Sequence, residues 1–213
     1  MENYSDLIEV ALDNKTWNFA NDVLYKLCSD NPKHDSDDVV AAKILFIGRT
    51  YAAAIERRTK TDNTPMGDDF YDKVVIPKII DSDIDSWFDS LRFGQPTTEQ
   101  LLHVHYQLTR LFTEISNQSK RSLASKYLHF HFPSYYFIFD SRSYRSVSEL
   151  THGMRVKTED VDSFDRSYRA FFLRCIELRN RLTEKYQLSL SPRDIDKILL
   201  TFDRLSKSVE NDS

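Results

Sequence analysis

A lysine and an aspartate near the middle of the chain are the side chains best suited to chemistry. Lys126 lies in a segment with the pattern of a helix from about Arg121 to His131, and Asp140 follows a short apolar run, 133–139, that we expect to be extended. An aspartate that begins a helix is held in place by bonds to backbone amides of the first turn. A carboxylate fixed in this way can activate a nucleophile or stabilise positive charge that develops on a sugar.

Both residues also have a purely structural interpretation. Asp140 can be a helix N-cap that bonds the amide of Arg142 or Ser143, and that bond is compatible with a role in catalysis. Lys126 can be an ordinary exposed lysine on a helix. Arg142 and Arg145 lie close to Asp140 along the chain, where they can bind phosphate or pair with its carboxylate and so lower its pKa.

The composition excludes several classes of protein. Apolar residues make up 40% and charged residues 29% of the 213 positions, with 4 Gly and 6 Pro, so the chain is neither disordered nor collagen-like. No glycine-rich phosphate-binding pattern occurs, which disfavours dinucleotide-binding and P-loop folds. Cys28 and Cys175 stand alone, and the two His-x-His pairs, 103–105 and 129–131, point to different sides of a helix. We therefore expect neither a metal site nor another cofactor.

Charge is unevenly distributed along a chain whose net charge is −4. Residues 100–157 hold 8 Lys and Arg against 3 Asp and Glu, whereas residues 1–99 hold 11 against 19. A basic patch can attract a polyanion even on an acidic protein, because binding depends on the surface that faces the ligand. The alternative is that these charges are scattered over solvated helix faces.

The hydrophobic spacing is helical nearly throughout and predicts an all-α protein. A buried helix is expected over 39–58. Thr97 and Gln100 have the spacing of a capping box at the start of another helix, and Ser191 with Pro192 is typical of the start of the last one. Two further helices show apolar stripes with a spacing of three to four residues: Leu101, Val104, Leu108, Leu111 and Ile115, then Phe164, Tyr168, Phe171, Cys175, Leu178 and Leu182.

We expect a single domain over 1–213, divided into an N-terminal helical lobe (1–96), a central segment (97–160) and C-terminal helices (161–213). The lobes are expected to meet around a central cleft. No apolar run is long enough to span a bilayer, and the start MENYSDLIEV lacks the features of a signal peptide. A cytoplasmic protein without a membrane partner is therefore expected.

Residues 119–150 resemble the helix-hairpin-helix DNA glycosylase superfamily, in particular its 8-oxoguanine DNA glycosylase-fold branch. In that family a helix that begins K-x-A is followed, sixteen or seventeen residues after the alanine, by an aspartate that opens the next helix. Here Asp140 follows Ala124 by sixteen residues. The resemblance implies a glycosylase-like helical fold in which Asp140 is the essential carboxylate and Lys126 is the nucleophile or a base-pocket residue. It also implies a nucleic-acid-binding shell of Lys120, Arg121, Ser122, Arg142 and Arg145.

Two features depart from the family pattern. Ser122 stands where bifunctional glycosylases carry the lysine that forms a Schiff base, and a serine cannot form that adduct. Lys126 lies one helical turn further on and on the same face, from where it can reach a sugar or a base. The segment SNQSK (116–120) replaces the hairpin L-P-G-x-G, so the glycines that admit a DNA phosphate are absent. Lys120, Arg121 and the helix N-terminus can replace part of that contact.

Two functions follow from the resemblance. The first is cleavage of the N-glycosidic bond of a modified or flipped purine nucleotide in DNA, with or without lyase activity. Related proteins occur in anti-phage defence operons, which implies a role in bacterial antiviral defence with operon proteins as partners. The second is a module that has lost the reaction and binds a nucleobase, a nucleic acid or a partner protein, which the missing glycines and the acidic isoelectric point favour. A helical interaction protein without a nucleotide ligand is a third interpretation.

Overall fold

The computed structural model describes residues 4–57, 65–153 and 164–211. Within these ranges every regular element is helical and no strand occurs, which confirms the predicted all-α class. The elements are α1 (Ser5–Asp13), α2 (Asn18–Asp30), α3 (Asp37–Thr50), α4 (Asp68–Phe70), the π-helical η1 (Tyr71–Val75), α5 (Ile76–Ile80), α6 (Ile84–Arg92), α7 (Thr98–Ser116), α8 (Arg121–His131), α9 (Ser141–Leu150), α10 (Arg166–Tyr186) and α11 (Pro192–Asn211).

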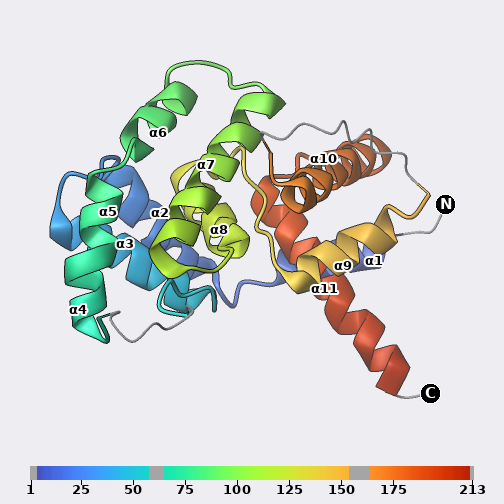
Figure 1. The fold of residues 1–213 in the computed structure, drawn as a ribbon. Helices are drawn as coiled ribbons and strands as arrows, with labels where there is room; N and C mark the ends of the chain where they lie inside the picture. Colours follow the sequence, from blue (N-terminus) through green and yellow to red (C-terminus); the bar gives the residue numbers. More distant parts are fainter. Residues whose placement is uncertain (1–3, 58–64, 154–163, 212–213) are drawn as a thin grey trace.

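The helices form two groups on either side of α7 and α8 (Figure 1). Helices α2 to α6 lie on one side, where α2 and α3 contact α8, and α9 to α11 lie on the other. The N-terminal helix α1 packs along α11 in the second group, so the first and last helices of the chain are neighbours. One continuous core joins the two groups, with buried residues from Ile8 in α1 to Leu199 in α11.

Local sequence signals place several helix ends correctly. The backbone nitrogen of Thr97 donates to Oε1 of Gln100 at 2.8 Å, and the backbone nitrogen of Gln100 donates to Oγ1 of Thr97 at 3.2 Å. This confirms the capping box ahead of α7, whose predicted apolar stripe is buried. Pro192 is the first residue of α11, and the backbone and hydroxyl of Ser191 both donate to Asp194.

The buried helix predicted over 39–58 is wrong at its end, because α3 stops at Thr50. Ala52 has a φ of 52°, and the chain turns back so that Ala53 N donates to the carbonyl oxygen of Gly48 at 2.7 Å. The turn buries Ile55 completely. Burying an isoleucine contributes about 1.5–3 kcal/mol, whereas helix propensity contributes a few tenths of a kcal/mol per residue, so tertiary packing overrides the alanine-rich sequence.

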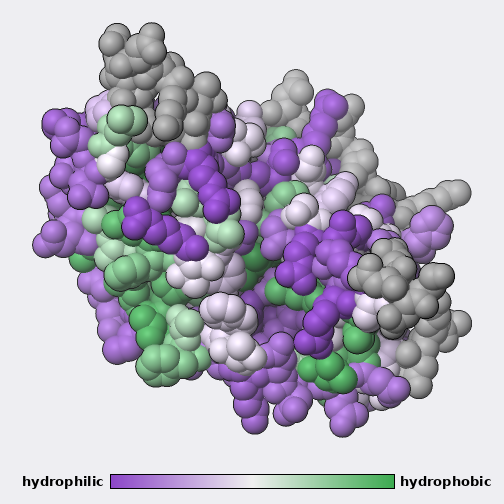
Figure 2. Space-filling model, turned by 90° about the horizontal axis from the view of Figure 1, so that it is seen from below, coloured by the Kyte–Doolittle hydropathy of each residue, from purple (hydrophilic) through white to green (hydrophobic). Residues whose placement is uncertain are grey.

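The face of the molecule drawn in Figure 2 is predominantly hydrophilic. Figure 2 shows one face on which hydrophilic residues form most of the surface and hydrophobic residues form separate patches. None of the described helices is both long and apolar enough to cross a membrane. Both cysteines are buried, and burial raises the pKa of Cys28 to about 12, so its thiol stays protonated.

Candidate functional site

Two serines of α8 hold the segment that leads to Asp140. The Oγ of Ser122 donates to the carbonyl oxygen of Phe139 at 2.9 Å, and the Oγ of Ser125 accepts from the amide nitrogen of Phe139 at 3.0 Å. The predicted extended run begins with a turn over 133–135 and continues without regular structure. Serine side chains therefore satisfy backbone groups that a neighbouring strand would otherwise bond, and they place Asp140 next to α8.

Lys126 is a buried residue of α8, not an exposed helix lysine. Its side chain is nearly inaccessible, and its Nζ donates to the Oγ of Ser122 at 2.7 Å. The Nζ also lies 6.0 Å from the centre of the Tyr51 ring. Burial lowers the pKa of Lys126, and the nearby carboxylates of Asp140 and Asp196 oppose that shift. A lysine with a lowered pKa provides more neutral amine, which is its nucleophilic form.

Asp140 is the N-cap of α9. Its Oδ1 accepts from the amide nitrogen of Ser143 at 2.9 Å, which confirms the predicted cap. The residue is half-buried, and its charge acts on both Lys126 and Asp196. One carboxylate therefore fixes the start of α9 and also acts electrostatically on the buried ammonium, so the structural and chemical interpretations are compatible.

A second carboxylate, Asp196 of α11, belongs to the same cluster, although the sequence analysis did not select it. Its side chain is buried, and Nη1 of Arg193 donates to its Oδ2. Its Oδ1 has no hydrogen-bond partner among the described residues. Burial, which outweighs the neighbouring cations, raises the pKa of Asp196 to about 6. The available signal was an acidic residue directly beside Ile195, inside the apolar stripe of the last helix.

Two predicted nucleic-acid contacts are engaged within the protein. Lys120 is buried, and its Nζ donates to the carbonyl oxygens of Ala54, at 3.2 Å, and Arg57. The Nε of Arg121 lies 2.7 and 2.6 Å from the two carboxylate oxygens of Asp165, which caps α10. Both cations thus connect α8 to neighbouring segments of the protein.

Arg142 and Arg145 do not pair with Asp140, as one interpretation of the sequence had it, but with Asp203 of α11. The Nε of Arg142 lies 2.8 Å from the Asp203 carboxylate, and Arg145 and Lys207 also donate to it. Hydrogen bonds from these cations hold the pKa of the buried Asp203 well below its usual range, in spite of burial. One carboxylate of α11 thus binds three cations at the seam between α9 and α11.

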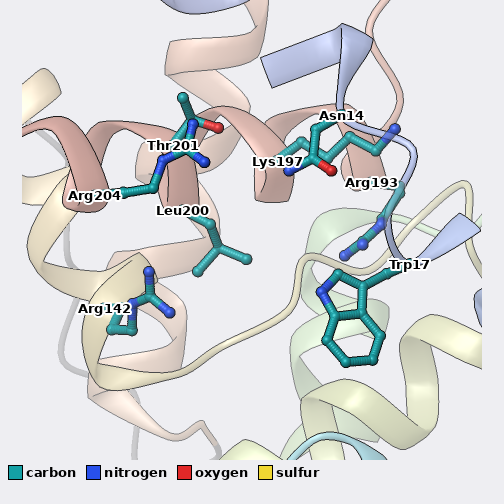
Figure 3. A pocket seen from close by; sticks show the side chains of 8 residues that line it. All are labelled: Asn14, Trp17, Arg142, Arg193, Lys197, Leu200, Thr201 and Arg204. Atoms are coloured by element: carbon teal, nitrogen blue, oxygen red, sulfur yellow. The ribbon is translucent and has the colours of Figure 1, made fainter. Parts of the chain in front are cut away.

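A pocket of about 170 Å³, here called the α11 pocket, lies beside this cluster. Trp17 and Arg193 lie at one end of it, and Arg142 and Arg204 at the other (Figure 3). Arg193 connects the pocket to the interior, because its own partner Asp196 faces Lys126. Neither Lys126 nor Asp140 lines the pocket. Its lining residues are Asn14, Trp17, Arg142, Arg193, Lys197, Leu200, Thr201 and Arg204.

Three histidines of the two His-x-His pairs make bonds and ring contacts inside the protein, namely His105, His129 and His131, whereas His103 is exposed. His129 donates from Nδ1 to the carbonyl oxygen of Tyr136 at 2.7 Å and accepts at Nε2 from the hydroxyl of Tyr25, also at 2.7 Å. The ring of His105 stacks on Tyr168, with 3.4 Å between the centroids. In the part of the chain that the structure describes, no group of three or more His, Cys, Asp or Glu side chains is arranged to hold a metal.

Comparisons with protein-family models, curated proteins and solved structures found no match to this chain. The structure brings Lys126, Ser122 and Asp140 together, adds Asp196, and places Arg142 on the wall of the neighbouring pocket.

Proposed function

We propose that the protein cleaves the N-glycosidic bond of a modified or flipped purine nucleotide, with Lys126 and Asp140 as its reacting groups. The observation that carries the proposal is the buried Nζ of Lys126, held 2.7 Å from the Oγ of Ser122 and within electrostatic reach of the carboxylate of Asp140. The proposal includes the finer architecture that the resemblance implies, a helix-hairpin-helix glycosylase fold with lobes around a cleft, and a role in antiviral defence.

A lyase-type reaction uses the amine of Lys126. The neutral Nζ attacks C1′ of the sugar, and the bond from C1′ to the base nitrogen breaks with its electron pair leaving on the base. The base takes up a proton from solvent, and the new secondary ammonium gives its proton to the carboxylate of Asp140. Asp140 then returns this proton to O4′ as the C1′–O4′ bond breaks, which opens the sugar ring and leaves a protonated Schiff base on Nζ. The lowered pKa of Lys126 supports this route, because it increases the neutral fraction.

A hydrolytic route uses Asp140 without a covalent intermediate. The carboxylate takes a proton from water while the water oxygen attacks C1′, and the base again leaves with the bonding electron pair. In that case the ammonium of Lys126 stays protonated and contacts the leaving base. Asp196, whose buried carboxyl has a pKa of about 6, supports Lys126 electrostatically in both routes.

Borohydride trapping on oligonucleotides that contain 8-oxoguanine, uracil or an abasic site distinguishes the two routes. Borohydride reduces a Schiff base to a stable amine, so the lyase route predicts a protein–DNA adduct that Lys126→Met abolishes. The hydrolytic route predicts base release without an adduct, lost in Asp140→Asn. Lys78→Met, which removes an exposed lysine of α5, is the matched control and should behave as wild type. An adduct that survives in Lys126→Met would contradict the lyase route.

The second candidate is a module that binds a nucleotide-containing ligand and does not cleave it. Two observations favour it. Lys120 and Arg121 are engaged within the protein, and neither Lys126 nor Asp140 lines the α11 pocket. Ligand binding with no base release from any of the three oligonucleotides, and with unchanged affinity in Lys126→Met and Asp140→Asn, would favour this function over cleavage.

A further inference from the structure

The α11 pocket gathers cations from two helices. Arg193, Lys197 and Arg204 are spaced along α11 by four and seven residues, which places them on one side of the helix, and Arg142 of α9 joins them. None of the residues that line the pocket is acidic. A chain with a net charge of −4 therefore concentrates four positive side chains around a single cavity.

Internal ion pairs neutralise only part of this charge. Arg193 pairs with Asp196, and Arg142 shares Asp203 with two other cations. No hydrogen bond or ion pair to any part of the described chain is found for Lys197 or Arg204. The local excess of positive charge predicts an anionic ligand, because a cavity lined by charge of one sign focuses the field.

Besides its charged residues, the pocket has an exposed aromatic side chain at its rim. Trp17 lies at the rim with 58% of its surface exposed, although a tryptophan is normally well buried. Its indole can stack on an unpaired base, and such stacking accompanies a basic groove in proteins that bind single strands.

We propose that the α11 pocket binds a phosphate of single-stranded nucleic acid, with an unpaired base of the same strand stacked on Trp17. Arg193 and Lys197, at the end of the pocket near Trp17, bind the phosphate oxygens, and Arg204 and Arg142 border the far end, where the strand continues. The inference rests on the proposed function in taking nucleic acid as the ligand, and it adds the place where the strand is held. A base paired within a duplex would not present its face to the exposed indole, which selects a single strand.

Binding of a labelled oligothymidine of about eight nucleotides, followed by fluorescence anisotropy, tests the proposal. Lys197→Gln/Arg204→Gln removes two charges from the pocket. The matched control, Lys73→Gln/Arg181→Gln, removes two exposed charges from η1 and α10. We expect the pocket variant to weaken binding at least about tenfold and to lower the salt dependence by roughly two charges, whereas the control stays within about twofold of wild type.

The stacking contact has its own test. Trp17→Ala should weaken binding by about five- to a hundredfold, and Trp17→Phe should retain much of the affinity because it keeps an aromatic face. The chain has 2 tryptophans, so in a Trp87→Phe background oligothymidine should quench the fluorescence of Trp17 alone. Inorganic phosphate should displace the oligonucleotide, since it competes for the same cations.

Two results would overturn the proposal. The first is equal affinity of the pocket and control variants, and the second is thymidine monophosphate binding as tightly as the oligonucleotide, which would indicate a free nucleotide instead of a strand. Failure of the proposed cleavage is distinguishable from both. Pocket-dependent binding of oligothymidine without base release from any of the three oligonucleotides would remove the proposed reaction and leave the binding site established.

Discussion

The Nζ of Lys126 lies 2.7 Å from the Oγ of Ser122, the residue that stands where the family resemblance expects a lysine. The amine thus comes from the next turn of α8 and reaches back to that position. Ser122 in turn donates to the carbonyl oxygen of Phe139, directly before Asp140. The single hydroxyl of Ser122 therefore links the amine of Lys126 to the backbone directly before Asp140.

Removing the hydroxyl of Ser122 should destabilise the protein, and the size of the loss should depend on whether Ser125 is present. Ser122→Ala deprives Phe139 of a donor and Lys126 of an acceptor, and Ser125→Ala removes the other bond to Phe139. Each change should lower the free energy of unfolding by about 1–3 kcal/mol. Both serines hold the same residue, so urea unfolding of the double variant should show a loss smaller than the sum of the single losses. Strict additivity would show that the two bonds act independently.

Asp196 should make the protein less stable as the pH rises from about 4 to 6. Its pKa is about 6 in the folded protein and 3.8 as the ordinary value, so between these limits the folded state binds more protons than the unfolded state. Over this range the free energy of unfolding of the wild type should fall by up to about 3 kcal/mol relative to that of Asp196→Asn. Arg193, Lys126, Asp140 and Arg142 face the carboxyl, and their charges are retained in the variant.

Urea unfolding at several pH values measures this difference. Asp22→Asn, on the exposed face of α2, is the control and should follow the wild type throughout. A constant difference between wild type and Asp196→Asn from pH 4 to 7 would mean that Asp196 titrates equally in both states.

The sequence alone was sufficient for features that depend on a few neighbouring residues. The Asp140 cap, the Thr97 capping box and the bounds of α8 follow from side chains within one turn of the residues they bond. The helical face shared by Ser122 and Lys126 follows from the period of the helix. These are local relationships, and tertiary packing did not change them.

Features formed by distant segments could not be predicted in the same way. The α11 pocket exists because α1 packs along α11, which brings Asn14 and Trp17 beside Arg193. The partner of Arg142 is Asp203, and no spacing rule connects those two residues. The early end of α3 has the same cause, because burial of Ile55 depends on the rest of the core.

His34, a buried residue between α2 and α3, should make the protein sensitive to acid. The ring of His34 bonds Asp85 at 2.7 Å through Nδ1 and the hydroxyl of Tyr127 at 2.9 Å through Nε2. Burial, assisted by Lys43, lowers its pKa from 6.5 to about 4 although Asp85 opposes the shift. The unfolded chain therefore binds more protons between these values, and the free energy of unfolding should fall as the pH drops from about 6.5 to 4.

His34→Gln should remove up to about 3 kcal/mol of that pH-dependent loss, whatever its effect on stability at neutral pH. The readout is the slope of the unfolding free energy against pH, measured by urea denaturation. His103→Gln, an exposed position on α7, is the control and should keep the wild-type slope. If His34→Gln keeps that slope as well, the acid sensitivity arises from other groups.

Gly48 of α3 should tolerate alanine and reject larger side chains. A Cβ built at this position would lie 3.2 Å from Cα of Ala54 and 3.6 Å from Cδ1 of Leu123, because the chain turns back there. Gly48→Ala gains about 1 kcal/mol of helix propensity, which offsets part of the steric cost. Gly48→Val adds two methyl groups against backbone that cannot move away, and it should destabilise by about 1–3 kcal/mol. Thermal unfolding of both variants beside the same substitutions at Gly94, which has open space around it, measures the effect. A Gly48→Val variant as stable as Gly48→Ala would show that the turn after α3 can shift to make room.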